Sequence, residues 1–331
     1  MRLRHTEGVE QGSATPGTGA TGEEGAARQR GANLWRLFLG LLWLGVAAWV
    51  GVTRGTVVVA GHPAYFVVVV LAGVLGLALL VTTLRPRRSR VSLWAWLGRA
   101  LAAVATLVVL GSVVYLRPFG ATEDAVAAME GTGAIRVDDA WTRITLTPTD
   151  GVTETALVFQ PGARVDARAY VPLLTSIAEQ GYLVVIVKQP LGIGFTALQA
   201  PEDVMEDHDE IGRWFVGGHS LGGVAASWFA TNGDREADGL LLWASYPVSR
   251  VPDRVEVTSV SGTEDTLTTP EDVEESRQRL PATTTFVAVE GAVHAFFGDY
   301  GEQPGDGTPT VSRAEAQQRI VEASVEALAG P

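Results

Sequence analysis

Three long apolar stretches constrain the fold of this chain more than any other feature of its sequence. They cover residues 37–53, 64–84 and 100–116, and each reaches or nearly reaches the roughly 20 residues that cross a bilayer as a helix. Buried helices of a soluble protein and a cleaved signal peptide are the alternatives, but no clear A-x-A cleavage site follows the first stretch. We therefore predict an all-α membrane anchor of three transmembrane helices within residues 34–117. Aromatic rings that favour the membrane interface lie near the ends of the stretches: Trp35, Trp49, Trp94, Trp96 and Tyr115.

Arginines flank the predicted spans unevenly. Arg28, Arg30 and Arg36 precede the first span, and the loop RPRRSR at 85–90 separates the second span from the third. The other two flanks hold single arginines only. Because positively charged loops stay in the cytoplasm, we expect a multi-pass protein of the cell membrane. Its N-terminus is expected in the cytoplasm, and everything after residue 117 outside.

Charge divides the chain into two unlike parts. Residues 1–117 carry 12 basic and 4 acidic side chains, a balance of +8, whereas residues 118–331 carry 13 basic and 33 acidic ones, a balance of −20. So acidic a domain excludes nucleic acid as a partner, because a phosphate backbone requires clustered Lys and Arg. The chain has no cysteine, and its five histidines show no H-x-x-x-H or H-E-x-x-H spacing. We therefore expect neither a metal nor a cofactor.

Composition also sets the expected domain boundaries. Residues 1–33 are rich in Gly, Thr, Ala and Glu and show no apolar period, which predicts a disordered tail. Residues 118–139 are expected to be a linker, and residues 140–331 a folded domain. Within that domain, strand-like runs alternate with helical ones, which predicts an α/β fold with a mostly parallel, doubly wound sheet. The strand-like runs are residues 141–147, 155–160, 182–187, 214–218, 240–245, 255–261 and 285–291; the helical ones are 166–180, 221–231, 270–280 and 312–328.

A serine lies at one of the predicted strand–helix corners. The stretch GGHSLGG (217–223) places Ser220 between a strand and the helix that follows it. Gly218 and Gly222 leave room for the strand and the helix to pack closely, so that the serine hydroxyl projects above the sheet. The helix N-terminus offers backbone N–H groups to a developing oxyanion. These features predict a nucleophilic serine rather than a simple glycine turn.

A serine nucleophile requires a base, and the base requires a carboxylate that orients it. His294 is the only histidine after Ser220, and it directly follows the last predicted strand. His219 and His208 are expected to be structural or solvated. Asp265 and Glu264 both qualify by position as the acid, and Asp265 is preferred because it lies a few residues beyond a strand end.

An oxyanion hole should complete this site. One donor is expected to be the N–H of Leu221, directly after the serine. The other is expected from the loop FQPGARVD (159–166), where Gly162 and Ala163 can both bring an N–H close to the substrate oxygen. The sequence does not distinguish between these two residues.

Together, these stretches resemble the α/β-hydrolase superfamily, and most of all the branch called alpha/beta hydrolase family 5, which is related to dienelactone hydrolases. The stretches that carry the resemblance are QPGARVDARAY, GYLVVIVKQPLGIGF, GGHSLGG, LLWASYP, SGTEDTLTTPE and GAVHAFFGDYGEQPGDGT, and it spans about residues 140–328. The resemblance implies an α/β-hydrolase fold in which Ser220, Asp265 and His294 occupy the triad positions. The oxyanion loop departs from the family pattern, with PGA where PGG is common.

These observations predict a membrane-anchored serine hydrolase that cleaves carboxylester, lactone or thioester bonds through an acyl-enzyme. Only about nine residues, YPVSRVPDR, separate two of the predicted strands at the place where a cap would be inserted. The site is therefore expected to be open and to take a small-molecule or lipid-like ester. The alternative is a hydrolase-like binding or sensing module at the membrane surface that does not catalyse a reaction.

Overall fold

The computed structural model describes residues 20–84 and 92–330. The first 19 residues of the predicted tail and the arginine-rich loop at 85–90 lie outside the described residues. The chain divides into two compact units. One consists of residues up to Val46 together with Ala72–Leu110, and the other of Ala47–Leu71 together with Gly111–Pro331.

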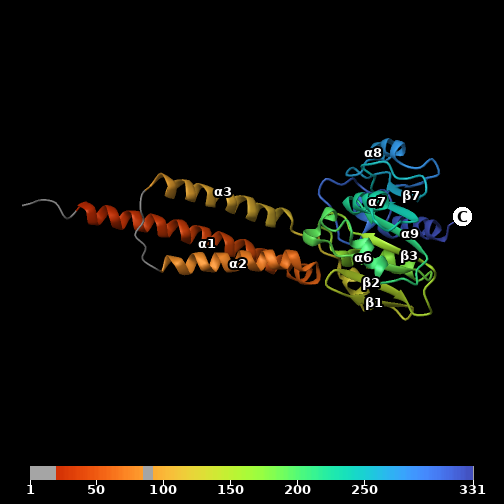
Figure 1. Ribbon diagram of the computed structural model, residues 1–331, viewed down its shortest axis with the longest axis horizontal. Coiled ribbons are helices and arrows are strands. Elements are labelled where there is room, and N and C mark those ends of the chain that lie inside the picture. The colour runs from red at the N-terminus through yellow and green to blue at the C-terminus, as the bar shows by residue number, and fades with distance from the viewer. Residues whose placement is uncertain (1–19, 85–91, 331) are drawn as a thin grey trace, which may run out of the picture. The chain divides into compact units, whose positions relative to one another are not determined.

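Three long helices, α1 (Ala20–Ala60), α2 (Pro63–Thr83) and α3 (Leu93–Tyr115), cover the predicted apolar stretches to within one residue (Figure 1). Within them, Asn33–Ala60, Pro63–Thr83 and Leu93–Tyr115 are long and apolar enough to cross a membrane, as predicted. Helix α1 begins inside the segment that was expected to be a disordered tail. The last residues of that segment, ATGEEGAARQRGAN, include four Ala, two Glu and two Arg, which have high helix propensity.

Small residues bring helices close together in the first unit. A Cβ added to Gly40 of α1 would lie 2.9 Å from the carbonyl oxygen of Gly76 in α2. The indole Nε1 of Trp43 also donates a 3.2 Å hydrogen bond to Thr106 Oγ1 in α3. Close backbone approach and polar contacts between helices are typical of packing in a bilayer, where lipid supplies no hydrophobic drive between helices.

The second unit is built on a mostly parallel sheet, as predicted. In the described residues the sheet has eight strands in the order β1-β2-β4-β3-β5-β6-β7-β8. Strands β1 and β2 are antiparallel to their neighbours, and the other strands run parallel. The strands are β1 (Ile135–Asp139), β2 (Arg143–Pro148), β3 (Thr155–Gln160), β4 (Leu183–Val187), β5 (Arg213–His219), β6 (Gly239–Trp243), β7 (Glu256–Gly262) and β8 (Thr285–Val289).

The sheet begins before the expected domain start at residue 140. The expected linker contains α4 (Glu123–Ala127), whose first turn is capped by Thr122, and the whole of β1. Strand β1 pairs with β2 along its full length and buries Ile135. The strand could not be predicted from its sequence, IRVDD, because only one face of β1 packs against the core and most of its residues are polar.

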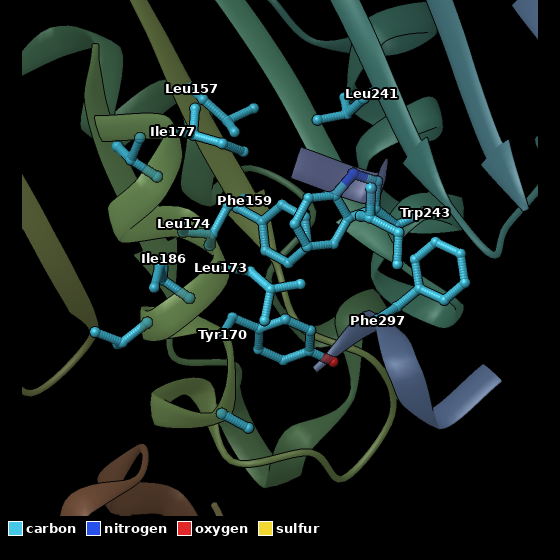
Figure 2. Packing of buried hydrophobic residues seen from close by; sticks show 14 of the residues in the cluster. Leu157, Phe159, Tyr170, Leu173, Leu174, Ile177, Ile186, Leu241, Trp243 and Phe297 are labelled. Atoms are coloured by element: carbon cyan, nitrogen blue, oxygen red, sulfur yellow. The ribbon is translucent and has the colours of Figure 1, made fainter. Parts of the chain in front are cut away.

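Helices cover both faces of the sheet. Helices α5 (Val171–Ala178) and α9 (Arg313–Ala329) pack on one face, and α6 (Ala200–Glu206) and α7 (Leu221–Asn232) on the other. Alternate residues of β3 enter the two layers, with Leu157 and Phe159 on the α5 side. Figure 2 shows this side, where the ring of Phe159 lies 4.7 Å from that of Trp243.

The connection between β6 and β7 is short. Residues 244–255 contain neither helix nor strand, so no cap is inserted at this point of the fold. Helix α8 (Pro270–Ser276) follows β7 and begins with a capping box between Thr269 and Asp272. Because β5, β6, β7 and β8 are parallel neighbours, the loops that follow β5, β7 and β8 leave the sheet at the same edge.

Candidate active site

Ser220 forms the sharp corner between β5 and α7. Its backbone has φ 52° and ψ −124°, a strained conformation for a residue with a side chain. Its N–H donates a 2.9 Å hydrogen bond to the carbonyl of Trp243 at the end of β6. Its carbonyl accepts from Ser245 Oγ at 2.7 Å. The corner is thus held on both sides by the neighbouring strand.

Glycines around Ser220 allow this corner to pack. A Cβ on Gly222 would lie 2.0 Å from the carbonyl oxygen of Gln160 at the end of β3. A Cβ on Gly218 would lie 2.4 Å from the carbonyl carbon of Gly222. Both contacts are with backbone, which has no rotamer by which to move away. The close packing expected from the sequence at these two glycines therefore matches the structure.

His294 and Asp265 meet at the same edge of the sheet. His294 begins the short 3₁₀ helix His294–Phe297 after β8, and Asp265 lies in the loop after β7. Nδ1 of His294 lies 2.8 Å from Oδ2 of Asp265, and both side chains are almost fully buried. The other carboxylate oxygen of Asp265 accepts from the N–H groups of Leu267 and Thr268, both at 2.8 Å. Glu264, the alternative acid, makes no hydrogen bond with a histidine in the described part of the chain.

A second aspartate, not anticipated from the sequence, fixes the backbone of His294. The carboxylate of Asp306 accepts from the N–H of His294 at 3.1 Å and from the N–H of Ala295 at 2.8 Å. Arg313 of α9 donates to the carbonyls of Ala295 and Gly298, each at 2.7 Å. Asp306 belongs to the turn GDGT, which was visible in the sequence but offered no sign of its partner.

Of the two N–H groups expected as oxyanion donors in the loop after β3, that of Ala163 has no acceptor among the described residues and that of Gly162 has one. The N–H of Gly162 donates to the hydroxyl of Tyr170 at 2.9 Å, so it already has an acceptor. The N–H groups of Ala163 and Leu221 donate no hydrogen bond to any described residue. Arg164, next in the loop, has φ 61° and donates its N–H to the carbonyl of Gly192 at 2.6 Å. Ala163 and Leu221 are therefore the donors left to face an oxyanion.

His219 is a buried neighbour of His294, in agreement with its expected structural role. Its Nδ1 lies 2.9 Å from the Tyr170 hydroxyl, and its ring centroid lies 4.5 Å from that of His294. The Tyr170 oxygen also accepts from the N–H of Gly162, so this hydroxyl links the loop after β3 to His219. Burial, and secondly the charge of His294, hold the pKa of His219 well below its ordinary value. Figure 2 shows the Tyr170 hydroxyl directed toward the side on which Phe297 lies.

His208 lies outside this cluster, in the segment before β5. His208, expected to be solvated, lies 3.1 Å from the exposed carboxylate of Glu210. In the described residues, no group of three or more His, Asp or Glu side chains has the arrangement of a metal site. The carboxyl ends of β5, β7 and β8 thus carry the strained serine corner and a buried imidazole–carboxylate pair.

Part of this chain matches a known protein family. Residues 156–319 match the sequence profile of the alpha/beta hydrolase family. No curated protein matches the chain. Similar solved structures include the following three. A serine hydrolase homologue from Coxiella burnetii is 15% identical, covers 58% of this chain and 97% of its own, and has a TM-score of 0.43. A putative dienelactone hydrolase from Klebsiella pneumoniae is 19% identical (54% and 90%, TM-score 0.41). A monoacylglycerol lipase from Paleococcus ferrophilus is 15% identical (56% and 98%, TM-score 0.43).

The matched segment contains the parallel strands β4 to β8 and nearly all of β3. It also contains Ser220, Asp265 and His294. The fold, the strained serine corner and the family profile coincide in the same residues. Through residues 156–319, this chain belongs to the alpha/beta hydrolase family.

Proposed function

We propose that this protein is a membrane-anchored serine hydrolase that cleaves ester-type bonds through an acyl-enzyme. Ser220 is the nucleophile, His294 the general base and Asp265 the carboxylate that orients the histidine. One observation carries this assignment. The buried 2.8 Å contact between His294 Nδ1 and Asp265 Oδ2 lies beside His219, which directly precedes the strained serine. A buried imidazole–carboxylate pair next to a serine corner has no evident use in packing.

The reaction follows from the charges of these groups. Asp265 accepts the Nδ1–H of His294, which leaves Nε2 of the neutral imidazole as the proton acceptor. As Ser220 Oγ bonds to the ester carbonyl carbon, its proton passes to Nε2. The imidazolium then gives this proton to the leaving alcohol or thiol as the carbon–heteroatom bond breaks. Water, deprotonated by the same histidine, releases the acyl group as a carboxylic acid and restores the serine.

The oxyanion of each tetrahedral intermediate is assigned to the N–H groups of Leu221 and Ala163. Both are backbone groups and have no protein acceptor among the described residues. They therefore need no reorganisation when negative charge develops on the carbonyl oxygen. Loss of one such donor typically slows acyl transfer by about 10²- to 10³-fold.

The three apolar helices support attachment to a membrane. The arginine distribution supports a cytoplasmic N-terminus and a catalytic domain on the outer face. The uncovered connection 244–255 supports a substrate that is a small or lipid-like carboxylester, lactone or thioester.

The test is hydrolysis by the full-length chain, purified in detergent, of a soluble p-nitrophenyl ester. Ser220→Ala should lower kcat by about 10⁴-fold or more. It should also abolish covalent labelling by a fluorophosphonate. Ser249→Ala is the matched control, because Ser249 is exposed in the segment 244–255 and touches none of these groups. A wild-type chain that is neither labelled nor active would instead indicate a binding or sensing module without catalysis.

A further inference from the structure

Exposed apolar side chains gather at one edge of the hydrolase sheet. Between residues 119 and 331, six large apolar side chains are exposed in the described structure, and four of them lie in connections at the edge of the sheet where the parallel strands end. We call these four the apolar rim: Trp141, Phe195, Val248 and Leu267, which are 77%, 51%, 59% and 38% exposed.

The sheet register explains why the apolar rim shares an edge. Strand β2 runs antiparallel to β4 with Arg143 opposite Val187, so the β1–β2 turn that holds Trp141 lies at the carboxyl end of β4. Phe195 follows that same end of β4, in the 3₁₀ turn Gly194–Thr196. Leu267 lies in the loop that leaves β7, and Val248 in the segment that leaves β6. Ser220, Asp265 and His294 also follow the carboxyl ends of their strands, so the rim borders the candidate active site.

The same edge meets the ends of the long helices within the second unit. Residues around the α1–α2 connection form one wall of a small cavity of about 50 Å³, and the loops after β3 and β4 form the opposite wall. A second hollow joins His62 to Thr142, Lys188 and Phe195. Burial, and secondly the charge of Lys188, lower the pKa of His62, in keeping with this position. The helix-connection residues of the first cavity are Val57, Val58, Gly61, His62 and Tyr65.

The end of α3 is tied to the same place. Arg164 of the oxyanion loop donates a 2.5 Å hydrogen bond to the carbonyl of Tyr115, the last residue of α3. Its guanidinium also lies over the rings of Tyr115 and Phe119, at 4.7 and 5.0 Å. Phe119 in turn pairs with Val165 as a parallel bridge. The three helices therefore end against the active-site edge rather than against the opposite edge.

We propose that the active-site edge of the sheet faces the surface of the bilayer that anchors the chain, and that the hydrolase takes a neutral, membrane-resident ester from that bilayer. The substrate class deepens the proposed hydrolase function and rests on it; the orientation does not. Tryptophan and phenylalanine at such an edge match the preference of aromatic rings for the membrane interface. The balance of −20 on residues 118–331 opposes attraction to anionic lipid, so tethering and apolar contact hold the edge at the membrane.

The orientation can be measured without any catalytic assay. The chain has no cysteine, so a single introduced cysteine can carry a nitroxide label. Trp141 and Val152 lie in the turns at opposite ends of β2, and both are exposed. We would label Trp141→Cys, Phe195→Cys and, as the matched control, Val152→Cys. The full-length chain would be placed in phosphatidylcholine nanodiscs, and collisions of each label with oxygen and with a water-soluble nickel chelate would be recorded.

The labels at 141 and 195 should collide with oxygen and lose access to nickel, whereas the label at 152 should do the reverse. Equal access to nickel at both ends of β2 would overturn the proposed orientation. Circular dichroism of each labelled chain checks that it is folded. Because no hydrolysis is measured, this result does not depend on whether Ser220 is a nucleophile.

The substrate class is tested with a fluorogenic neutral acylglycerol in vesicles. The full-length chain would share its vesicle with the ester, or face the ester in separate vesicles. Sharing one membrane raises the effective concentration, so hydrolysis should be at least about tenfold faster in the shared arrangement. The double change Trp141→Ser and Phe195→Ser should lower the shared-vesicle rate relative to the rate on soluble p-nitrophenyl acetate, and Val152→Ser should leave both rates unchanged.

Equal rates in the two vesicle arrangements would overturn the substrate class. Hydrolysis of soluble ester alone, with none of the vesicle ester, would overturn it as well. Absence of activity on every ester would instead contradict the proposed hydrolase, while the nitroxide measurement would still decide the orientation.

Discussion

At the scale of single residues, two adjacent carboxylates compete for one role. Only Asp265 reaches His294 Nδ1, and its second oxygen is held by two backbone N–H groups. Asp265→Asn keeps the shape of the side chain but favours the wrong imidazole tautomer, so kcat/KM for a soluble ester should fall by about 10⁴-fold. Glu264→Gln is the matched control and should change kcat/KM by less than about threefold. A severe loss from Glu264→Gln with a mild loss from Asp265→Asn would move the acid to Glu264.

A second residue-scale prediction concerns His219 and pH. Its pKa in the folded chain is held well below that in the unfolded chain, mainly by burial. Below about pH 6.5 the unfolded chain binds a proton at this histidine and the folded chain does not. The free energy of unfolding should therefore fall by about 1.4 kcal/mol for each pH unit below about pH 6.5. Above that pH the contribution of the neutral His219 to stability should be complete.

Denaturant unfolding of the full-length chain in detergent, between pH 5 and pH 7, measures this dependence. His62 should lower the free energy of unfolding at acid pH in the same way, because its pKa is also lowered. The pH dependence of the wild-type chain is therefore compared with that of His219→Gln. Glutamine removes the titrating group at 219 and leaves His62 in place. An unchanged pH slope in His219→Gln would contradict the assignment of a buried, neutral His219.

At the scale of elements, the sequence predicted the strands and helices that are apolar along their length. All seven strand-like runs correspond to strands. The continuous Val, Ile and Leu run of β4 and the Leu run of β6 are buried along their whole length, as strands covered on both faces should be. Strand β1 and helix α6 were missed, since IRVDD and APEDVME are short and each contains three charged residues. Their existence depends on tertiary pairing, which local composition does not encode.

The candidate site shows the same division. The residues next to strand ends, such as Ser220 and His294, could be identified from order along the chain. The hydrogen bond from the N–H of Gly162 to the Tyr170 hydroxyl could not be predicted, because it depends on a side chain eight residues away that folds back over the loop. The same is true of Asp306, which holds the backbone of His294 from a turn twelve residues later.

The contact of α7 with β3 gives an element-scale prediction. A Cβ on Gly222 would lie 2.0 Å from the Gln160 carbonyl and 2.3 Å from that of Pro161, so α7 must move away from β3. Gly222→Ala should lower the free energy of unfolding by about 1–3 kcal/mol or more. It should also impair hydrolysis, because the same shift displaces Ser220 from the oxyanion loop. Thermal unfolding and kcat of the full-length chain measure the two effects.

Gly133 supplies the matched control for this experiment. It lies in the same domain, has no positive φ, and a Cβ there would have no neighbour within 4 Å. Gly133→Ala should therefore leave the unfolding temperature within a few degrees of wild type, at a cost below about 0.5 kcal/mol. Equal effects of the two changes would mean that the α7–β3 contact is not rigid.

At the scale of the whole molecule, the charges on the two parts of the chain predict which side of the membrane each part faces. Arg85, Arg87, Arg88 and Arg90 form the densest positive cluster beside any span, whereas the hydrolase domain carries the balance of −20. Moving one such arginine through the bilayer centre costs about 2.5 kcal/mol or more, so four strongly disfavour the inverted arrangement. With three spans, we expect the loop and the N-terminus in the cytoplasm and the hydrolase domain outside.

Protease added to right-side-out spheroplasts tests this topology. The hydrolase domain, followed by a C-terminal epitope, should be digested, while an N-terminal epitope on the same chain should be protected. Replacing all four arginines of the loop with glutamine should weaken the bias and leave part of the population with a protected C-terminal epitope. Lysed spheroplasts, in which both epitopes are accessible, provide the control. Protection of the hydrolase domain in sealed spheroplasts would place the active-site edge on the cytoplasmic leaflet, so that the ester would have to come from that leaflet instead.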